Sequence, residues 1–371
     1  MKKVAISIGD LNGISMQILL QAHKELIKIC EPFYFIHYEI FLKASKLLNI
    51  TLQDEFNLVE FSSKEQENFI FKEKKGNFKI YTYTALLDQE VDIDFTINAG
   101  MLDAKVGAYS FLSFQAASKC TRNYLDALTT LPINKKAWQM SQINYKGHTE
   151  ALRAFFDKDT IMMLGCEELF VALYTEHIAL REVYKHINAL DLAKFLIQFY
   201  QCTLFKPIGV LSFNPHASDD GVIGGEEEIQ IKKAIKIANV FLKDDGLNLN
   251  ELSNDVLLSE KEKALNFKED IFINEPLVAD SAFIPSSLKK CKYLVSMYHD
   301  VALAPLKALY FEKSINVSLN LPIIRTSVDH GTAYDIAYKN KKINLQSYIQ
   351  AVKSALEFLK IKEKNKQNLL K

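Results

Sequence analysis

Residues 3–26 read KVAISIGDLNGISMQILLQAHKEL, a stretch that combines two kinds of periodicity. Its first part, KVAISIG, is a short apolar run of the kind that forms a buried strand. Its last part, ISMQILLQAHKEL, has apolar residues at helical spacing. The stretch therefore predicts a strand, a turn and a helix, which is the repeating unit of an α/β fold.

The same alternation continues through most of the chain. Further buried strands are predicted at 124–133, 169–175, 208–213, 292–297 and 315–319. Helical stretches lie between several of them, for example at 226–242 and 343–360. Strands that alternate with helices predict α/β layers around mostly parallel sheets. The charged, weakly periodic segment 243–270 is expected to be a surface insertion between a helix and the next core strand.

Length and composition bound the class of protein. A chain of 371 residues exceeds what one core usually serves, so two domains are expected. The formal net charge of zero provides no long-range field for nucleic acid or an anionic membrane. No apolar run approaches the roughly 18–20 residues that span a bilayer. A first apolar run too short for a signal peptide, and five scattered cysteines without a CxxC pair, indicate a cytoplasmic protein.

Three histidines follow predicted strands at the edge where open α/β sheets bind ligands. They are His177, His216 and His299. Converging neutral imidazoles bind a divalent metal and leave positions open for a substrate. Taken alone, His299 beside the apolar run YLVSM is more typical of a structural histidine. No short ligand spacing such as HExxH is present, so a metal site here depends on the convergence of the three strands.

A second group of side chains suits an anion. His148 and Thr149 offer donors at a predicted helix start, where backbone N–H groups also point outward. Lys307, Asn316 and Arg325 lie on or near the last strands. Individually these residues could be a helix cap, a surface lysine or a strand-end amide. Together they fit a phosphate plus a carboxylate, and they predict a small anionic substrate.

The nucleotide-binding signal is less direct. The segment IGDLNGIS follows a strand and opens a helix, but it lacks the GxGxxG fingerprint. The segment DHGTAYD at 329–335 is the better candidate, because Gly331 allows the backbone to approach a ligand before a helix begins.

The motifs LPINKKAW, GHTE, NPHA, PLVADSAF, MYHD and RTSVDHGTAYDIA occur in this order. With them the chain resembles the 4-hydroxythreonine-4-phosphate dehydrogenase family, NAD-dependent enzymes of pyridoxal phosphate biosynthesis, from residue 4 to about residue 360. The sequence departs from the family pattern at GDLNGISMQ, at Val301 and Ala302 after MYHD, and at GGEEE.

The resemblance implies an isocitrate/isopropylmalate dehydrogenase-like fold with two α/β/α domains and an active-site cleft between them. The first domain is expected to contain 1–133 and 326–371, and the second to contain 134–325 with the dimer interface and the metal site. The family also implies a homodimer whose active sites include residues from both subunits.

Site residues follow from the same resemblance. The implied metal ligands, one of them supplied by the partner subunit, are His177, His216 and His299. The ion would be zinc, magnesium or cobalt. The implied substrate-binding residues are His148, Thr149, Lys307, Asn316 and Arg325. The residues expected to approach NAD or NADP are Asp329, His330, Gly331 and Thr332.

The implied reaction is the oxidative decarboxylation of 4-phosphohydroxy-L-threonine to 3-amino-2-oxopropyl phosphate and CO2. Asp300 and Asp280 are candidates to accept the hydroxyl proton, or to orient the ligand histidines instead. Three alternatives stay open: a related dehydrogenase for another phosphorylated threonate, a metal-dependent phosphatase, and a non-catalytic binding protein. The phosphatase would leave DHGTAYD unexplained.

Overall fold

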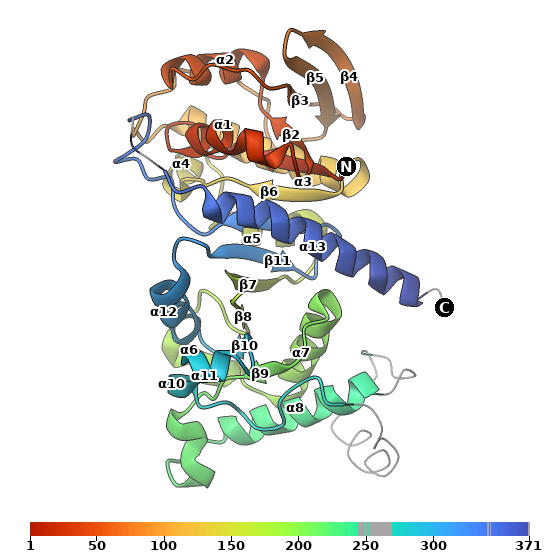
Figure 1. Cartoon of the computed structure of the whole chain (residues 1–371), viewed down its shortest axis with the longest axis vertical. Helices are drawn as coiled ribbons and strands as arrows, with labels where there is room; N and C mark the ends of the chain where they lie inside the picture. Colours follow the sequence, from red (N-terminus) through yellow and green to blue (C-terminus); the bar gives the residue numbers. More distant parts are fainter. Residues whose placement is uncertain (244–248, 250–251, 253–268, 340, 342, 370–371) are drawn as a thin grey trace. The chain divides into compact units, whose positions relative to one another are not determined.

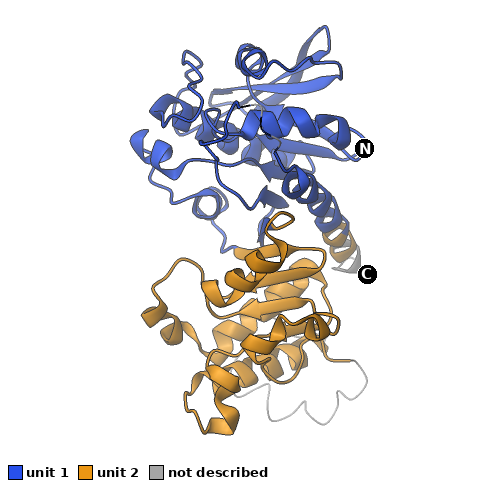
Figure 2. Ribbon diagram, turned by 60° about the vertical axis from the view of Figure 1, so that its left-hand side comes forward, with its two compact units in different colours: residues 1–160, 315–360 blue, residues 161–314, 361–371 orange. Residues whose placement is uncertain are grey.

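The computed structural model describes residues 1–243, 249, 252, 269–339, 341 and 343–369. The chain divides into two compact units, residues 1–160 with 315–360 and residues 161–314 with 361–371 (Figure 2). Strands and helices alternate in both, so the predicted α/β class is confirmed. The divisions differ from the expected boundaries at 133/134 and 325/326, both of which fall inside the first unit.

The first unit has strands and helices that are labelled in Figure 1. The strands are β1 (Lys3–Ser7), β2 (Glu31–Phe35), β3 (Phe56–Ser63), β4 (Asn68–Lys75), β5 (Phe78–Ala85), β6 (Ala127–Thr130), β11 (Ile315–Leu319) and β12 (Arg325–Val328). The helices are α1 (Ser15–Leu26), α2 (Tyr38–Leu47), α3 (Ala104–Asn123), α4 (Lys135–Met140), α5 (His148–Phe156) and the first part of α13 (Gln346–Leu369).

The sheet of the first unit has the strand order β4-β5-β3-β2-β1-β6-β12-β11. Strands from β5 to β12 in this order are parallel, while β4 and β11 run antiparallel to β5 and β12. Because β1, β6 and β12 are parallel neighbours, the loops that follow them leave the same edge of the sheet. The nucleotide-binding candidate leaves that edge after β12, and Arg325, the first residue of β12, reaches Thr130 at the end of β6 through its side chain.

Packing against α3 explains why the first unit extends to residue 160. The helix begins after Asp103, whose side chain accepts a 3.0 Å hydrogen bond from the backbone N of Val106. The indole of Trp138 in α4 is fully buried and donates a 2.9 Å hydrogen bond to Ser110 Oγ in α3. The ring of His148 in α5 lies 4.5 Å, between centroids, from that of Phe114 in α3. These contacts attach α4 and α5 to the core of the first unit.

The second unit has a smaller sheet. Its strands are β7 (Ile161–Cys166), β8 (Leu169–Leu173), β9 (Ile208–Val210) and β10 (Tyr293–Ser296), in the order β7-β8-β10-β9. Its helices are α6 (Leu180–His186), α7 (Ala189–Thr203), the 3₁₀ segment η1 (Pro215–Gly221), α8 (Glu227–Lys243), α10 (Ala279–Ala282), α11 (Pro285–Leu288) and α12 (His299–Tyr310). Strand β10 is parallel to both β8 and β9, and β7 is antiparallel to β8.

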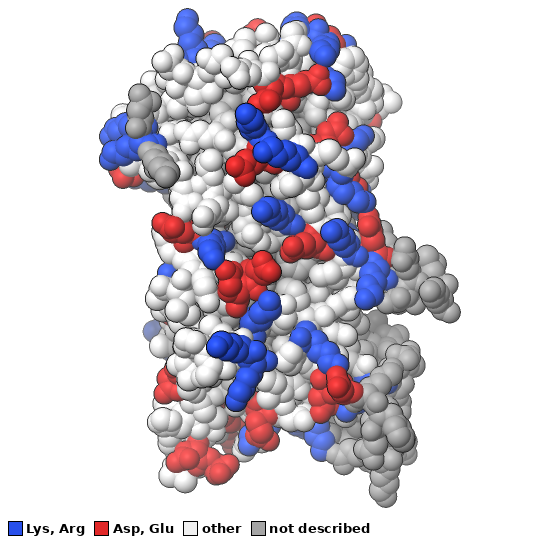
Figure 3. Space-filling view, viewed as in Figure 1, with Lys and Arg blue, Asp and Glu red and all other residues white. Residues whose placement is uncertain are grey.

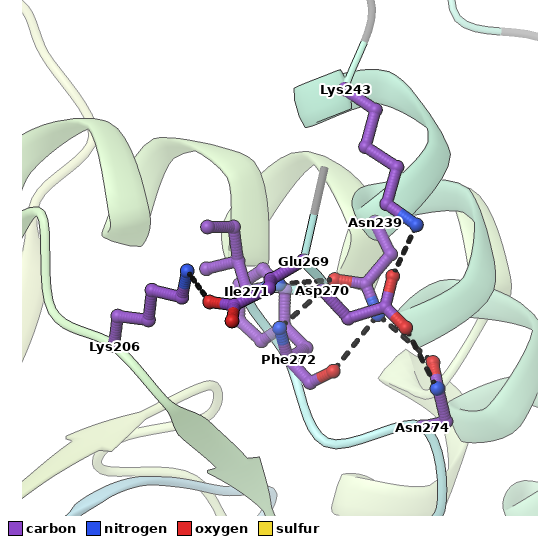
Figure 4. A network of polar contacts seen from close by, with 8 residues as sticks. All are labelled: Lys206, Asn239, Lys243, Glu269, Asp270, Ile271, Phe272 and Asn274. Atoms are coloured by element: carbon purple, nitrogen blue, oxygen red, sulfur yellow. Dashed lines mark hydrogen bonds and ion pairs between the residues drawn. The ribbon is translucent and has the colours of Figure 1, made fainter. Parts of the chain in front are cut away.

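The expected insertion at 243–270 falls mostly outside the described residues, but its two ends are described. Lys243 Nζ forms a 2.6 Å ion pair with Asp270 Oδ1 (Figure 4). The side-chain oxygen of Asn239 in α8 accepts hydrogen bonds from the backbone N atoms of Ile271, at 3.1 Å, and Phe272, at 2.9 Å. The two ends of this segment therefore lie next to each other in the second unit.

On the face drawn in Figure 3, cationic and anionic side chains are interspersed within each unit. No helix in the described part of the chain combines the length and the apolar character needed to cross a membrane.

Candidate active site

Three loops of the second unit carry the predicted metal ligands. His177 follows β8, His216 lies in η1 after β9, and His299 is the first residue of α12 after β10. Because β10 is parallel to both β8 and β9, these loops leave the same edge of the sheet. The topology therefore places the three histidines at one edge of the second unit's sheet.

Two of the histidines lie side by side. The ring centroids of His177 and His299 are 5.7 Å apart, with an angle of 45° between the ring planes. Their loops are joined by a buried hydrogen bond in which Thr175 Oγ1 donates to the carbonyl oxygen of Met297 at 2.6 Å. No group of three or more His, Cys, Asp and Glu side chains able to hold a metal ion occurs among the described residues.

Asp300 contacts His299 directly. Its Oδ1 lies 2.7 Å from His299 Nδ1, and its Oδ2 accepts a 3.1 Å hydrogen bond from the hydroxyl of Tyr298. The hydrogen bonds to His299 and Tyr298 lower the pKa of the Asp300 carboxyl. The ionised carboxylate can then accept a hydrogen bond from Nδ1 of the imidazole. In the tautomer that carries its proton on Nδ1, the other ring nitrogen, Nε2, has the lone pair that a metal-binding histidine uses.

The loop that carries His216 is attached to a residue that the sequence reasoning missed, Glu228. This carboxylate is only 3% exposed. Its Oε1 accepts from the backbone N of Phe213 at 2.7 Å and of Asn214 at 2.8 Å, and its Oε2 accepts from Asn214 Nδ2 at 2.7 Å. The signal for it was the run GGEEE, which was noted only as a departure from the family pattern.

Beyond this attachment, the backbone of η1 is unusual. Residues 216–220 all have positive φ, between 45° and 65°. A non-glycine residue in the left-handed region costs of order 1 kcal/mol, and such strain is concentrated at functional sites. Asp280, the other acidic candidate, is exposed in the first turn of α10, which packs against η1.

Arg325 is the most informative residue of the first unit. It opens β12 with 2% exposure, and its guanidinium donates to Ser318 Oγ at 3.1 Å and to Thr130 Oγ1 at 2.7 Å. Its Nε is buried and has no hydrogen-bond partner. Burial lowers the pKa of Arg325 to about 9, and among the described residues no carboxylate lies within ion-pair distance of it. A buried guanidinium with only neutral hydroxyl partners indicates a binding site for an anion.

His148 lies near Arg325 at the start of α5. Burial, followed by the charges of Arg325 and Lys135, holds the pKa of His148 well below its usual range, so the imidazole is neutral. His148 Nε2 and Asn316 Oδ1 are, like Arg325 Nε, buried polar atoms without a partner. Buried polar groups are nearly always hydrogen-bonded, so these three atoms are suited to contact a polar ligand.

Two further substrate candidates are Thr149 and Lys307. Thr149, half-buried, follows His148 in the first turn of α5. Lys307 belongs to the second unit, on the same helix as His299, with its amine 5.6 Å from the ring centroid of Phe311. The structure thus brings His148 close to Arg325 in the first unit. Lys307 lies in the second unit, on the helix that begins with His299.

The expected nucleotide loop packs against the first loop of the chain. The backbone N of Ile14 donates to the carbonyl oxygen of Thr332 at 3.0 Å, and a Cβ atom at Gly13 would lie 2.6 Å from that oxygen. Tyr334 donates a 2.6 Å hydrogen bond to Asp10, whose carboxyl is buried and has a raised pKa because of that burial. The sequence by itself gives no sign that these two segments meet.

Two expectations for helix starts had different outcomes. The helix predicted at His148 is present as α5. The helix expected directly after Gly331 is absent: the chain forms a turn at 334–338, and the next helix is α13 from Gln346. The reason is that residues up to Tyr338 bond to the first loop, with the Tyr338 hydroxyl donating to the carbonyl oxygen of Leu11 at 2.9 Å.

Solved structures define the class of protein to which this fold belongs. A 4-hydroxythreonine-4-phosphate dehydrogenase from Klebsiella pneumoniae is similar with a TM-score of 0.69 and 24% identity, covering 97% of this chain and 100% of that one. One from Burkholderia phymatum has a TM-score of 0.66 and 25% identity, covering 96% and 98%. The chain has the fold of these dehydrogenases.

Sequence relatives define the family. The model of the family described as "Pyridoxal phosphate biosynthetic protein PdxA" matches residues 28–355. Relatives named 4-hydroxythreonine-4-phosphate dehydrogenase are 55% identical in Campylobacter jejuni (strain RM1221), over 96% of this chain and 98% of the relative, and 39% identical in Helicobacter pylori (strain J99 / ATCC 700824), over 95% and 98%. The chain belongs to the PdxA family, and the resemblance inferred from the ordered motifs is confirmed.

Proposed function

We propose that this chain is a cytoplasmic enzyme that catalyses the NAD-dependent oxidative decarboxylation of 4-phosphohydroxy-L-threonine. A hydride passes from the carbon that bears the hydroxyl group to NAD, and the hydroxyl proton leaves. The resulting β-keto acid loses CO2 and yields 3-amino-2-oxopropyl phosphate. The observation that carries the proposal is the buried Arg325, which has hydroxyl partners and no carboxylate among the described residues, in a chain of this family.

Substrate binding is assigned to the anion-binding candidates. The candidates are His148, Thr149, Asn316 and Arg325 of the first unit and Lys307 of the second. Arg325 is rigid because two hydroxyl groups orient its guanidinium. Fixed donors of this kind bind a charged group with little loss of side-chain entropy and place the reacting carbon against the nicotinamide.

The nucleotide, NAD or NADP, is assigned to the loop from Asp329 to Thr332 at the carboxyl end of β12. Two hydrogen bonds attach this part of the chain to the first loop: the backbone N of Ile14 donates to Thr332, and the hydroxyl of Tyr334 donates to Asp10. Gly331 is exposed, and apart from its chain neighbours no atom of the described residues lies within 4 Å of where its Cβ would be, so the backbone there is open to a ligand.

The imidazoles of the second unit suit a divalent metal. His177 and His299 already adjoin, and Asp300 keeps Nε2 of His299 as its acceptor nitrogen. His177, His216 and His299 would hold the ion, which is zinc, magnesium or cobalt. When bound, the ion supplies Lewis-acid polarisation of the substrate hydroxyl and of the ketone formed from it.

The two aspartates then divide the remaining roles. Asp300 is occupied by His299 and Tyr298, which suits it to orient the ligand histidine. Asp280 is exposed in α10 and is the candidate to accept the hydroxyl proton. An Asp280→Asn variant is therefore expected to lose turnover while its metal affinity stays unchanged.

The decisive assay follows NADH absorbance with 4-phosphohydroxy-L-threonine, with and without added divalent metal. NADH should form with this substrate, and a chelator should abolish the signal. His216→Ala should be folded and inactive; near-wild-type turnover of the pure variant in chelator-treated buffer would rule out the histidine triad. NADH formation only with another phosphorylated threonate would point to the related dehydrogenase. Phosphate release without NAD would point to a phosphatase.

The enzyme is also proposed to be a homodimer with shared active sites. Because His177 and His299 adjoin within one chain, His216 is the ligand that the partner subunit would supply. A mixed dimer of His216→Ala and His299→Ala chains would then contain one intact site and one damaged site. Mixing the two inactive variants should restore activity, and no restoration would mean that both histidines come from one chain.

A further inference from the structure

Lys135 lies at the anion-binding edge of the first unit, although the sequence reasoning assigned it no role. It is the first residue of α4, directly after the loop that follows β6. The side chain of Asn134 caps this helix by accepting from the backbone N atoms of Lys136, at 2.9 Å, and Ala137, at 3.1 Å. Helix α4 therefore begins just after the carboxyl end of β6, where Thr130 accepts the hydrogen bond from Arg325.

The side chain of Lys135 runs beside the entry to α5. A Cβ atom at Gly147 would lie 3.4 Å from Lys135 Cε and 4.0 Å from Lys135 Nζ. Gly147 has φ +153°, and it directly precedes His148. The lysine amine therefore lies next to the N-terminus of a nine-residue helix, where backbone N–H groups and the helix dipole favour an anion.

The charges around this point are one-sided. Lys135 and Arg325 are cationic, and both lower the pKa of His148, which confirms that they are close to it. Lys135 is exposed, and the described residues provide no hydrogen-bond or ion-pair partner for its amine. The carboxylate of the first turn of α5, Glu150, is exposed and accepts a short hydrogen bond from the backbone N of Lys146 instead.

We infer that Lys135 is a further substrate-binding residue, and that with Arg325 and the N-terminus of α5 it binds the phosphate group of the substrate. Two cations and a helix N-terminus, with the neutral imidazole of His148 near both cations, match a phosphate dianion better than the single charge of a carboxylate. The inference rests on the proposed function, because it assigns one end of the proposed substrate to one group of residues.

The neighbouring lysine provides a matched test. Lys135→Met and Lys136→Met each remove one exposed charge from the first turn of α4. The dissociation constant of inorganic phosphate is measured by calorimetry on the full-length protein, together with KM, kcat and the affinity for NAD. Lys135→Met should weaken phosphate and raise KM about tenfold, the loss expected for one charged contact, with NAD affinity and kcat unchanged. Lys136→Met should change none of these, and Lys135→Arg should restore most of the affinity.

The outcomes separate this inference from the proposed function. Phosphate binding needs no turnover, so an inactive protein that loses phosphate on Lys135→Met would retain the inference and contradict the proposed reaction. An active enzyme whose Lys135→Met variant keeps phosphate affinity and KM within twofold of wild type would overturn the inference alone. Equal losses in Lys135→Met and Lys136→Met would reduce Lys135 to general surface charge and would also overturn it.

Discussion

The hydroxyl group of Tyr334 donates a 2.6 Å hydrogen bond to Asp10 Oδ2, although the two residues are 324 positions apart in the chain. Asp10 belongs to the loop after the first strand, and Tyr334 to the loop proposed to bind the nucleotide. Burial raises the pKa of the Asp10 carboxyl, and the hydroxyl of Tyr334 is its side-chain partner. The bond therefore connects the first motif of the sequence to the shape of the proposed nucleotide site.

Tyr334→Phe should weaken NAD about tenfold, because it removes one hydrogen bond to a buried carboxyl and releases the loop. Phosphate affinity should not change. Asp10→Asn keeps an acceptor oxygen for Tyr334 and should lose less. Calorimetric titration with NAD checks both variants. If Tyr334→Phe binds NAD as tightly as wild type, the bond does not shape the nucleotide loop.

Glu228→Gln should weaken metal binding although Glu228 is not a proposed metal ligand. The amide replaces one carboxylate oxygen with a donor, so either the two backbone N–H bonds or the bond from Asn214 Nδ2 loses its acceptor, and the loop leading to His216 loosens. A loss of 10- to 100-fold in metal affinity is expected, as for other residues that orient ligands. Glu226→Gln, an exposed position in the same acidic run, is the control. Equal metal affinity in both variants would exclude a positioning role for Glu228.

Arg325→Lys should raise KM for the substrate by about 10- to 100-fold and leave NAD affinity nearly unchanged. Lysine retains the charge but cannot bond Ser318, Thr130 and a ligand together in the fixed geometry of the guanidinium. Steady-state kinetics with each substrate varied in turn measure the effect. The control is Arg122→Lys at an exposed position, which should behave as wild type. An unchanged substrate KM would count against Arg325 as an anion contact.

His23 should make the protein sensitive to acid. Its ring is buried, stacked on Phe56 and hydrogen-bonded to the Tyr34 hydroxyl and the Glu55 carbonyl oxygen. Burial lowers the pKa of His23 from 6.5 to about 4, so the unfolded chain binds the proton more readily. The stability is present above pH 6.5 and falls between pH 6.5 and 4, by roughly 1.4 kcal/mol per pH unit.

His23→Gln cannot titrate, so its stability should depend less on pH. Between pH 7.5 and 5, wild type should lose about 2 kcal/mol more than the variant in urea unfolding. Parallel stability curves for the two proteins would mean that His23 does not remain neutral in the folded state.

Asn239 should be the anchor that closes the second unit after the segment 244–268. Besides accepting from Ile271 and Phe272, its amide donates to the carbonyl oxygen of Phe272 at 2.9 Å (Figure 4). Asn239→Ala leaves these backbone groups unpaired and should cost about 2–4 kcal/mol of unfolding free energy. Lys206→Ala breaks only an exposed ion pair with Glu269 and should cost less than about 1 kcal/mol. Similar losses in the two variants would contradict the anchor.

Local patterns determined much of this protein from the sequence. Strand and helix type depend on the spacing of apolar residues over short stretches, and the predictions for β1, α1, β10 and β11 are confirmed. The ordered motifs identified the family for the same reason, because each motif is contiguous. They also singled out Arg325 and His148, and the structure shows that each has a buried polar atom without a hydrogen-bond partner.

Tertiary structure alone decided which distant segments meet. Local periodicity does not encode the pairing partner of a strand, so the antiparallel β11 and the division at residues 160/161 were not predictable. Burial of Arg325 without a carboxylate, the capture of Asn214 by Glu228 and the approach of Lys135 to α5 all depend on how strands are ordered in the sheet. Local sequence determines whether a stretch forms a strand or a helix. Hydrogen bonds such as that from Tyr334 to Asp10 form only when segments far apart in the chain pack together.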